Sequence, residues 1–146
     1  TIEAAVTAAE TGHLVLGTLH TSGATRTIDR IIDAFPASAR DQIRAQLSTS
    51  LSAVISQCLL HTTDDKRVAA FEIMIRADAV GAKIRDGKTY QLLTDIETGG
   101  ARGMRTLDSD LLALFFQGTV SEEEVFNYCQ NPEAMRERMR GGAAAR

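Results

Sequence analysis

The segment from Glu10 to Thr21 reads E-T-G-H-L-V-L-G-T-L-H-T and constrains the fold of this chain more than any other. Its apolar run is too short for a buried helix, and its branched residues favour a buried strand. Gly12 follows an alanine-rich helical pattern, at the position where a left-handed residue ends a helix. The segment therefore predicts a buried strand between His13 and His20, formed around Leu14, Val15, Leu16 and Leu19.

The end of this predicted strand carries polar side chains that can form the floor of a binding site. Thr18, His20 and Thr21 stand there, and in open α/β sheets ligands bind at the carboxyl ends of strands. An imidazole at a strand end can hydrogen-bond a phosphate or an attacking water. The alternative is a histidine that only satisfies a turn, and the pattern alone favours that alternative.

Length and composition narrow the class of protein. The 146 residues suffice for one domain or for two small ones that share a core, and 44% of them are hydrophobic. A net charge of −3, with both signs mixed, gives no footprint for nucleic acid. Cys58 and Cys129 lack C-x-x-C spacing, so neither a zinc site nor a disulfide framework is expected. No apolar run approaches the ~20 residues of a membrane span, and no signal peptide opens the chain. Because the first residue is a threonine that already belongs to a helical pattern, we expect a fragment without its N-terminal part.

The order of patterns predicts an α/β part followed by a helical part. Strand patterns end at Ile75, so we expect an α/β unit over residues 1–75, a helical domain over 76–140 and a disordered tail over 141–146. Within the first unit the patterns predict helices over 1–11, 24–35 and 39–56, a strand over 59–61, a turn over 62–66 and a returning strand over 67–75. In the second unit they predict helices that begin near Asp78, Thr89, Thr106, Ser121 and Asn131.

Several segments taken together resemble one protein family over nearly the whole chain. They are A-A-E-T-G-H before the apolar run, T-I-D-R-I-I-D after it, then V-I-S-Q, R-V-A-A-F-E-I-M-I, E-T-G-G-A-R-G-M-R-T-L-D and C-Q-N-P-E. The first of these, with the run itself, resembles the histidine box of the secretion-superfamily hexameric ATPases, in the branch of the type IV pilus retraction ATPases. The resemblance implies an α/β fold: the C-terminal part of a RecA-like ATPase core, followed by a small all-helical domain.

The same resemblance implies a function and a set of partners. The complete protein would be a cytoplasmic homo-hexamer, peripheral to the inner membrane, that hydrolyses ATP with Mg²⁺ to retract pili and drive twitching motility. Its expected partner is the platform protein of the pilus machinery, and neither nucleic acid nor zinc is expected. The phosphate-binding motif G-x-x-x-x-G-K-[ST] is absent from this chain. In the family that motif and the acidic Walker B segment lie before the first residue here, so the fragment is expected to be inactive alone.

Candidate site residues follow from the resemblance. His20 matches the second histidine of the box and is the catalytic candidate. Support of the nucleotide site is expected from His13, Thr18, Thr21 and Gln57. Arg26 and Arg30 are subunit-interface candidates, although a solvated helix face paired with Asp29 and Asp33 is the simpler alternative. Residues 79–86 align with the family's retraction signature A-I-R-N-L-I-R-E. The candidates there are Ala79, Ile84, Arg85 and Asp86, whereas Gly81, Ala82 and Lys83 depart from it. No residue is expected to bind a metal.

Three other functions remain open at this point. An accessory retraction paralogue shares most of these motifs. A pilus-assembly or type II secretion ATPase usually carries a paired C-x-x-C zinc insertion where this chain has only the short turn 62–66. The apolar helical stripes alone also fit a non-catalytic helical interaction module.

Overall fold

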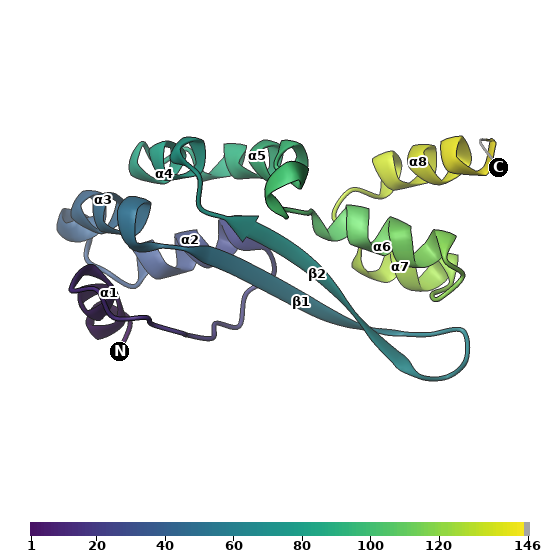
Figure 1. Cartoon of the computed structure of the whole chain (residues 1–146), viewed down its shortest axis with the longest axis horizontal. Coiled ribbons are helices and arrows are strands. Elements are labelled where there is room, and N and C mark those ends of the chain that lie inside the picture. Colours follow the sequence, from purple (N-terminus) through teal and green to yellow (C-terminus); the bar gives the residue numbers. More distant parts are fainter. Residues whose placement is uncertain (145–146) are drawn as a thin grey trace.

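A long antiparallel β-hairpin runs through the molecule and joins two groups of helices (Figure 1). The computed structural model describes residues 1–144. Strand β1 (Ala53–His61) pairs with β2 (Arg67–Ile75) along its whole length, from Ala53 opposite Ile75 to His61 opposite Arg67. The polar turn 62–66 closes the hairpin, as the sequence predicts. Every second residue of each strand faces the helices, which gives the period of two that a half-buried hairpin requires.

The first lobe surrounds the open end of the hairpin. Its helices are α1 (Ile2–Glu10), α2 (Ala24–Asp33), α3 (Arg40–Ser50), α4 (Asp78–Arg85) and α5 (Leu92–Thr98), with short 3-10 turns η1 (Ala37–Ala39), η2 (Thr89–Gln91) and η3 (Gly100–Arg102). Their apolar faces meet in one core: Val6, Ala24, Ile28, Ile32, Ile43, Leu47, Val54, Met74, Val80, Ile84, Leu92, Ile96 and Met104.

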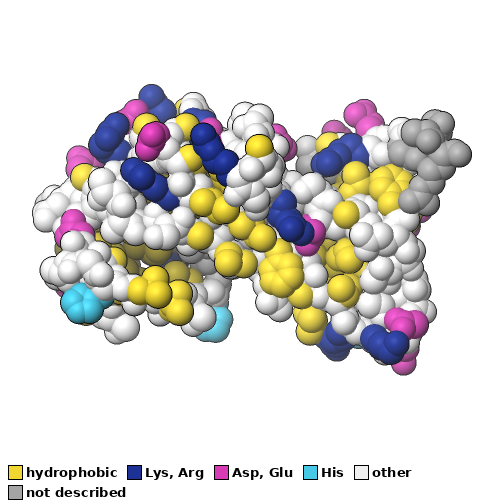
Figure 2. Space-filling view, in the orientation of Figure 1, with side chains coloured by type: hydrophobic (Ala, Val, Ile, Leu, Met, Phe, Trp, Pro, Cys, Tyr) yellow, Lys and Arg dark blue, Asp and Glu magenta, His cyan; other side chains and the backbone are white. Residues whose placement is uncertain are grey.

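The second lobe packs against the turn end of the hairpin and consists of α6 (Leu107–Phe116), α7 (Glu122–Tyr128) and α8 (Pro132–Ala144). The predicted caps are confirmed, because the hydroxyls of Thr106 and Ser121 accept from the third amide of α6 and α7. A second core forms there from Leu60, Ala70, Leu111, Val120, Val125, Met135 and Met139. The space-filling view shows the lobes as two masses with a narrower middle (Figure 2).

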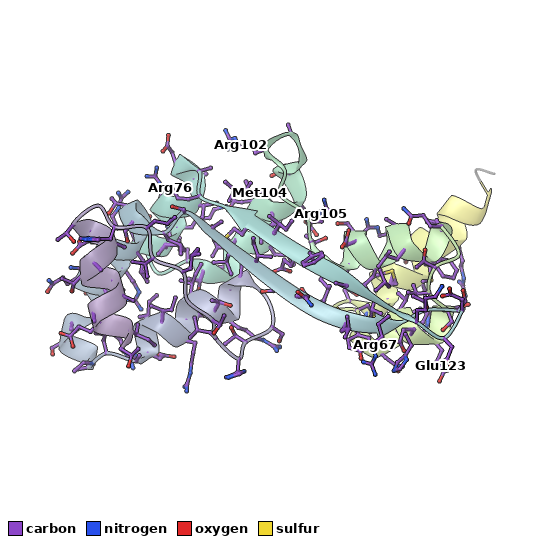
Figure 3. All side chains as sticks on the ribbon, turned by 60° about the horizontal axis from the view of Figure 1, so that its bottom comes forward. Arg67, Arg76, Arg102, Met104, Arg105 and Glu123 are labelled. Carbon is purple, nitrogen blue, oxygen red and sulfur yellow. The ribbon has the colours of Figure 1, made fainter. Side chains whose placement is uncertain are left out.

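The chain crosses from one lobe to the other along the edge of β2, at Arg105. Ile73 and Arg105 exchange both backbone hydrogen bonds, at 2.9 and 3.0 Å, so Arg105 adds one antiparallel bridge to the hairpin. The Asp110 carboxylate then accepts from the Arg105 guanidinium at 2.7 Å and from the backbone N–H of Phe71 at 2.8 Å. The start of α6 is thereby fixed to the middle of the hairpin (Figure 3).

The predicted buried strand after Gly12 is wrong for this chain. Residues 13–20 form neither strand nor helix, and Leu14 and Leu16 are 87% and 89% exposed. A strand needs a hydrogen-bonded neighbour, and within residues 1–144 the sheet consists of β1 and β2 alone, neither of which pairs with this segment. Its apolar side chains therefore lie on the surface.

The long helix predicted over residues 39–56 is also wrong at its C-terminal end. Helix α3 ends at Ser50, Leu51 is extended with ψ 119°, and β1 begins at Ala53. The apolar spacing across this boundary fits a helix, but Val54 also faces inward on a strand, opposite Met74. Pairing with β2 gives this stretch a ladder of backbone hydrogen bonds, and tertiary pairing here overrides the helical pattern.

The two cores divide the chain differently from the boundary expected at Ile75. Helices α4 and α5 follow Ile75, yet their side chains complete the core of the first lobe, and the hairpin contributes to both cores. The tail expected to be disordered, residues 141–146, is helical in α8 as far as Ala144. Residues 145–146 lie outside the described part of the chain.

Candidate functional site

The histidine segment begins at a well-formed helix end. The N–H of Gly12 donates to the carbonyl of Ala9 and the N–H of His13 to that of Ala8, both at 3.1 Å, while Gly12 has φ +90°. This is the pairing of a Schellman motif, so the predicted role of Gly12 is confirmed. His13 is exposed, and its Nδ1 lies 3.1 Å from the Thr11 hydroxyl. His13 thus leaves α1 held by a single polar contact.

The catalytic candidate stands on the loop that leads into α2. His20 and Thr18 are exposed, and within residues 1–144 neither side chain has a hydrogen bond. The Thr27 hydroxyl, which donates to the Gly23 carbonyl at 2.8 Å, accepts from the Thr21 hydroxyl at 2.7 Å. Thr21 is therefore anchored to the first turn of α2. The other two candidates of this loop, Thr18 and His20, face solvent.

A buried carboxylate that the sequence argument missed holds the start of α2. Glu72 of β2 is only 3% exposed, and its Oε1 accepts from the backbone N–H of Ala24 at 2.7 Å. The N–H of Gly23 donates to the Ser56 hydroxyl of β1 at 3.1 Å. The signal was available in the sequence, because Glu72 occupies an inward position of the run R-V-A-A-F-E-I-M-I, between Ala70 and Met74. A charged residue on the buried face of a strand requires a partner.

Of three further candidates, only Arg26 makes a hydrogen bond to the histidine loop within residues 1–144. Gln57, expected at the end of a helix, stands in the middle of β1 opposite Phe71, and its exposed side chain faces away from the helices. Arg26 Nη1 donates to the Ser22 hydroxyl at 3.0 Å, and Arg30 is exposed. The salt bridges expected between these arginines and the aspartates of α2 do not form in the described structure, because both aspartates bind elsewhere: Asp29 to Thr89 and Asp33 to Arg40.

The retraction-signature candidates divide into one core residue and a surface group. Ile84 is completely buried in the core of the first lobe. Ala79, Arg85 and Asp86 are exposed, and Arg85 Nε lies 3.8 Å from Asp86 Oδ1. Helix α4 therefore presents a charged end to solvent while its apolar side packs inward.

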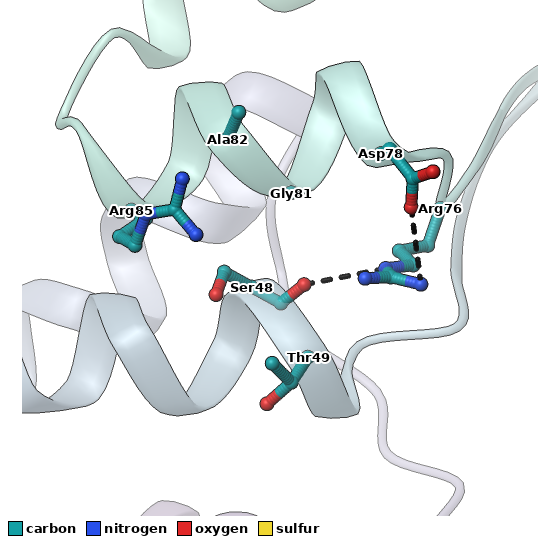
Figure 4. A pocket seen from close by; sticks show the side chains of 7 residues that line it. All are labelled: Ser48, Thr49, Arg76, Asp78, Gly81, Ala82 and Arg85. Carbon is teal, nitrogen blue, oxygen red and sulfur yellow. Dashed lines mark hydrogen bonds and ion pairs between the residues drawn. The ribbon is translucent and has the colours of Figure 1, made fainter.

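Close packing explains why α4 carries a glycine in its interior. A Cβ on Gly81 would lie 2.8 Å from the backbone carbonyl oxygen of Ser48, at the end of α3 (Figure 4). Contacts that short essentially never occur for a real Cβ, and the obstacle is backbone. The arginine that the family signature has at this position would therefore require α3 and α4 to move apart.

A shallow cavity of about 230 Å³ lies beside this contact. Its charged and hydroxyl-bearing walls come from Ser48, Thr49, Arg76, Asp78 and Arg85 (Figure 4). Arg76 Nε donates to the Ser48 carbonyl at 3.3 Å, and its Nη1 lies 3.8 Å from Asp78 Oδ1. The side chains of Arg76 and Arg85 both remain more than a third exposed, so this surface can accept an acidic group.

The histidine loop and the signature helix meet through α2. Thr89, which follows α4, donates through its hydroxyl to Asp29 Oδ1 at 2.9 Å, and its carbonyl accepts from the Thr25 hydroxyl at 3.3 Å. Ile28 and Ile84 share one core. The two groups of candidates are therefore connected by one packed helix, although the structure does not join them in a single pocket.

The run Gly87-Lys88-Thr89 looks like the end of a phosphate-binding loop but has another role. The N–H of Gly87 donates to the Ile84 carbonyl, and that of Lys88 to the Lys83 carbonyl at 2.8 Å. These amides close the end of α4, where Gly87 has φ +70°. With its hydroxyl donated to Asp29, Thr89 also differs from the metal-binding threonine of such a loop.

In the part of the chain that the structure describes, neither a metal-binding site nor a reactive thiol site is assembled. No group of three or more His, Cys, Asp or Glu residues is placed to hold a metal ion there. Burial raises the pKa of the Cys58 thiol, and also that of Cys129. At neutral pH these thiols stay protonated and react poorly. Among the described helices none is long and apolar enough to cross a membrane.

Comparison with known proteins assigns the family. A model of the family described as type II/IV secretion system protein matches residues 1–91. The chain is 51% identical over 136 residues to the twitching motility protein of Neisseria gonorrhoeae, covering 92% of this chain and 36% of that protein. It is 49% identical over 133 residues to the type IV pilus retractation ATPase PilT of Pseudomonas aeruginosa, and the match covers 91% of this chain and 39% of PilT. The type IV pilus ATPase PilU of the same organism is 34% identical over 137 residues, covering 93% and 36%.

Solved structures agree with the sequence comparison. The crystal structure of the pilus retraction motor PilT with bound ADP superposes with a TM-score of 0.84 at 37% identity, covering 93% of this chain and 38% of that chain. The Legionella pneumophila ATPase DotB gives 0.72 at 29% identity, covering 85% and 34%. The chain thus spans less than two-fifths of the length of these relatives. It belongs to the type II/IV secretion system protein family.

Proposed function

We propose that this chain is part of a hexameric ATPase motor that retracts type IV pili, and so drives twitching motility, by hydrolysing ATP. The observation that carries the proposal is the identity of 51% and 49%, over 92% and 91% of the chain, to a twitching motility protein and a PilT. In the complete motor, residues 1–75 would complete a RecA-like core, and of the helical part 76–140 the helices α4 and α5 would pack against that core. The phosphate anchor and the Mg²⁺ ligands would come mostly from residues outside this chain.

The alternatives are less well supported. An accessory retraction ATPase is disfavoured because the identity to PilU, 34%, falls below the 49% to PilT of the same organism. An assembly or secretion ATPase is disfavoured because the short turn 62–66 has no room for the paired C-x-x-C insertion. The Thr62 hydroxyl closes this turn by accepting from the Lys66 N–H at 2.8 Å. A non-catalytic helical module would not need the histidine segment.

Within this motor we assign His20 as the residue that senses the γ-phosphate. Its exposed side chain, without a hydrogen bond in residues 1–144, is available for a ligand. Thr21, anchored to α2, would fix the loop, and Thr18 would add a hydroxyl contact. His13 would bridge the end of α1 and the loop. These roles rest on the resemblance of the segment to the histidine box.

The exposed apolar segment fits an unfinished sheet. Leu14 and Leu16, each more than four-fifths exposed, are costly on a surface in contact with water. In the complete motor this segment would pair with further strands of the ATPase core and become the buried strand that its pattern predicts. Gln57 would then support the site from the hairpin, and Arg26 and Arg30 would face a neighbouring subunit of the homo-hexamer.

The motor would bind Mg-ATP and act in the cytoplasm, peripheral to the inner membrane. Its partner there would be the platform protein of the pilus machinery. The charged surface that includes Arg85 and Asp86, at the end of the retraction signature, is our candidate for transmitting motion toward that partner.

Substitution of His20 tests the proposed site in the complete motor. We expect His20→Ala to lower ATP turnover far more than ATP affinity, because loss of one contact to developing charge typically costs ~2–4 kcal/mol of barrier. His61→Ala is the matched control, since His61 is an exposed histidine at the far end of the hairpin. Steady-state ATPase assays with both variants would reject the assignment if His20→Ala stayed within about twofold of His61→Ala. If the unsubstituted complete protein showed no ATPase activity, the motor proposal itself would be wrong.

A further inference from the structure

We propose that Glu72 and Gln130 are positioning residues through which the second lobe holds the loop that carries His20. The link runs from Asp108 of α6 through Gln130 and the Glu72 carboxylate to the first amide of α2. That the held loop serves ATP hydrolysis rests on the proposed function, whereas the link itself rests on the contacts described next.

Both amides at the start of α2 are held by side chains of the hairpin. Ala24 donates to Glu72 Oε1 at 2.7 Å and Gly23 donates to the Ser56 hydroxyl at 3.1 Å. Ser56 and Glu72 stand opposite each other in the register of β1 and β2, so the two acceptors form one rigid unit. A carboxylate at this end of a helix also interacts favourably with the helix dipole. His20 lies only three residues before Gly23.

The fit at Gly23 is tight enough to fix the direction of the loop. Gly23 has φ +89°, a conformation that other residues rarely adopt, and a Cβ there would lie 3.3 Å from Glu72 Oε1. The chain can therefore turn into α2 directly over the carboxylate. A shift of Glu72 would move the amides that define the end of the histidine loop.

The second oxygen of the same carboxylate is held by the second lobe. Gln130 Nε2 donates to Glu72 Oε2 at 3.1 Å. Gln130 lies between α7 and α8, where its own N–H donates to Asp108 Oδ1 at 2.7 Å and that of Asn131 donates to Asp108 Oδ2 at 3.0 Å. Asp108 stands in the first turn of α6. The position of Gln130 is therefore set by two elements of the second lobe.

This link bypasses the apolar packing of the two lobes. Their cores share no residue within the described chain, and the hairpin is the structure common to both. Glu72 of the hairpin also connects the lobes by hydrogen bonds. One oxygen of its buried carboxylate accepts from the first lobe and the other accepts from the second lobe. A rearrangement of α6–α8 that withdrew Gln130 would leave Oε2 buried without this donor and would loosen the start of α2.

Amide hydrogen exchange in the 146-residue chain, read by NMR, tests the link without any activity assay. We expect Gln130→Ala to speed exchange at Ala24 by about threefold to tenfold, the effect of one lost hydrogen bond, with Gly23 following. Gln117→Ala is the matched control, a surface glutamine of the second lobe with an exposed side chain. The amide of Leu111, in the core of the second lobe, reports global opening and is expected to remain unchanged.

Variants of Glu72 extend the test. Glu72→Gln keeps an acceptor for Ala24 and is expected to preserve more protection there than Glu72→Ala. Unchanged exchange at Ala24 in Gln130→Ala would overturn the link, and this surface substitution remains informative even if Glu72→Ala fails to fold.

The complete motor tests the functional part. There Gln130→Ala is expected to lower kcat severalfold with little change in KM for ATP, and the loss is expected to be absent in a His20→Ala background. If exchange at Ala24 rises but turnover stays the same, while His20→Ala abolishes it, the positioning role is wrong and the proposed function survives. If His20→Ala also leaves turnover unchanged, the proposed role of His20 fails independently of the exchange result.

Discussion

At some positions of this chain, the surroundings permit only one kind of side chain or only one side-chain orientation. Gly81 is the sharpest example, because the carbonyl of Ser48 occupies the space that a side chain would need. Glu72 is another, since a buried carboxylate with two donors has one workable orientation. His20 is the opposite case: it is exposed, and within residues 1–144 its side chain makes no hydrogen bond.

Substitution of Gly81 measures this close contact. Alanine in a helix interior is normally favoured over glycine by ~1 kcal/mol, whereas overpacking typically costs ~1–3 kcal/mol. We expect Gly81→Ala to lower the free energy of unfolding, because the added Cβ meets backbone rather than a flexible side chain. Gly100→Ala is the control, since nothing lies within 4 Å of a Cβ there. Urea denaturation in which Gly81→Ala proves as stable as Gly100→Ala would contradict the packing described for α3 and α4.

At the scale of elements, the helices that follow Ile75 belong to different lobes because of what their apolar faces meet. Helix α4 packs along α3 and contributes Val80 and Ile84 to the first core, whereas α6 places Leu111 in the second. The signature helix is therefore a structural part of the lobe that carries the histidine loop. Thr89 and Asp29 reinforce this connection by a hydrogen bond of 2.9 Å.

Truncation of Ile84 tests the packing of α4. Ile84 is fully buried, and Ile84→Ala is expected to destabilise the chain by ~2–5 kcal/mol through lost burial and the remaining cavity. Leu93→Ala, at a side chain that is 39% exposed, is the control and is expected to cost much less. Chemical denaturation of both variants gives the comparison. Similar losses for the two would show that α4 is not packed as described.

At the scale of the whole molecule, two lobes share one hairpin and are linked through the carboxylate of Glu72. Within residues 1–144, the first lobe exposes an apolar segment at Leu14 and Leu16 and the charged end of α4, where Asp86 pairs with Arg85 and Lys88. The first fits burial in the ATPase core of the proposed motor. The second fits contact with another component, because charged and solvated groups dominate it.

Substitution of Arg85 tests whether the end of α4 transmits motion in the proposed motor. If the signature carries motion toward the pilus machinery, Arg85→Ala is expected to leave ATP hydrolysis largely intact while reducing twitching. We expect a partial loss, because Gly81 departs from the family signature. Arg67→Ala, at an exposed cation beside the turn of the hairpin, is the control. ATPase rate and twitching zone measured in the same strains give the answer: unchanged motility at normal expression excludes Arg85 from transmission, and a parallel loss of hydrolysis would place it at the nucleotide site instead.

The sequence by itself determined the features whose causes are local. Gly12 ends α1, Thr106 and Ser121 cap α6 and α7, and the polar turn 62–66 closes the hairpin, because each depends on a few neighbouring residues. The resemblance of the motifs pointed to the secretion-ATPase family that the comparisons then established, whereas the candidate histidines stay predictions. These conclusions did not require knowledge of the tertiary contacts.

Only the tertiary structure decided the features that depend on a distant partner. The end of α3 at Ser50 follows from pairing between Val54 and Met74, which competes with an equally good helical pattern. The segment after Gly12 forms no strand and stays exposed because strand formation needs a neighbouring strand, which its own apolar residues cannot supply. The joining of Glu72 to both Ala24 and Gln130, residues 48 and 58 positions away, is likewise invisible to local pattern, because hydrogen bonds of this kind are set by the fold and not by spacing along the chain.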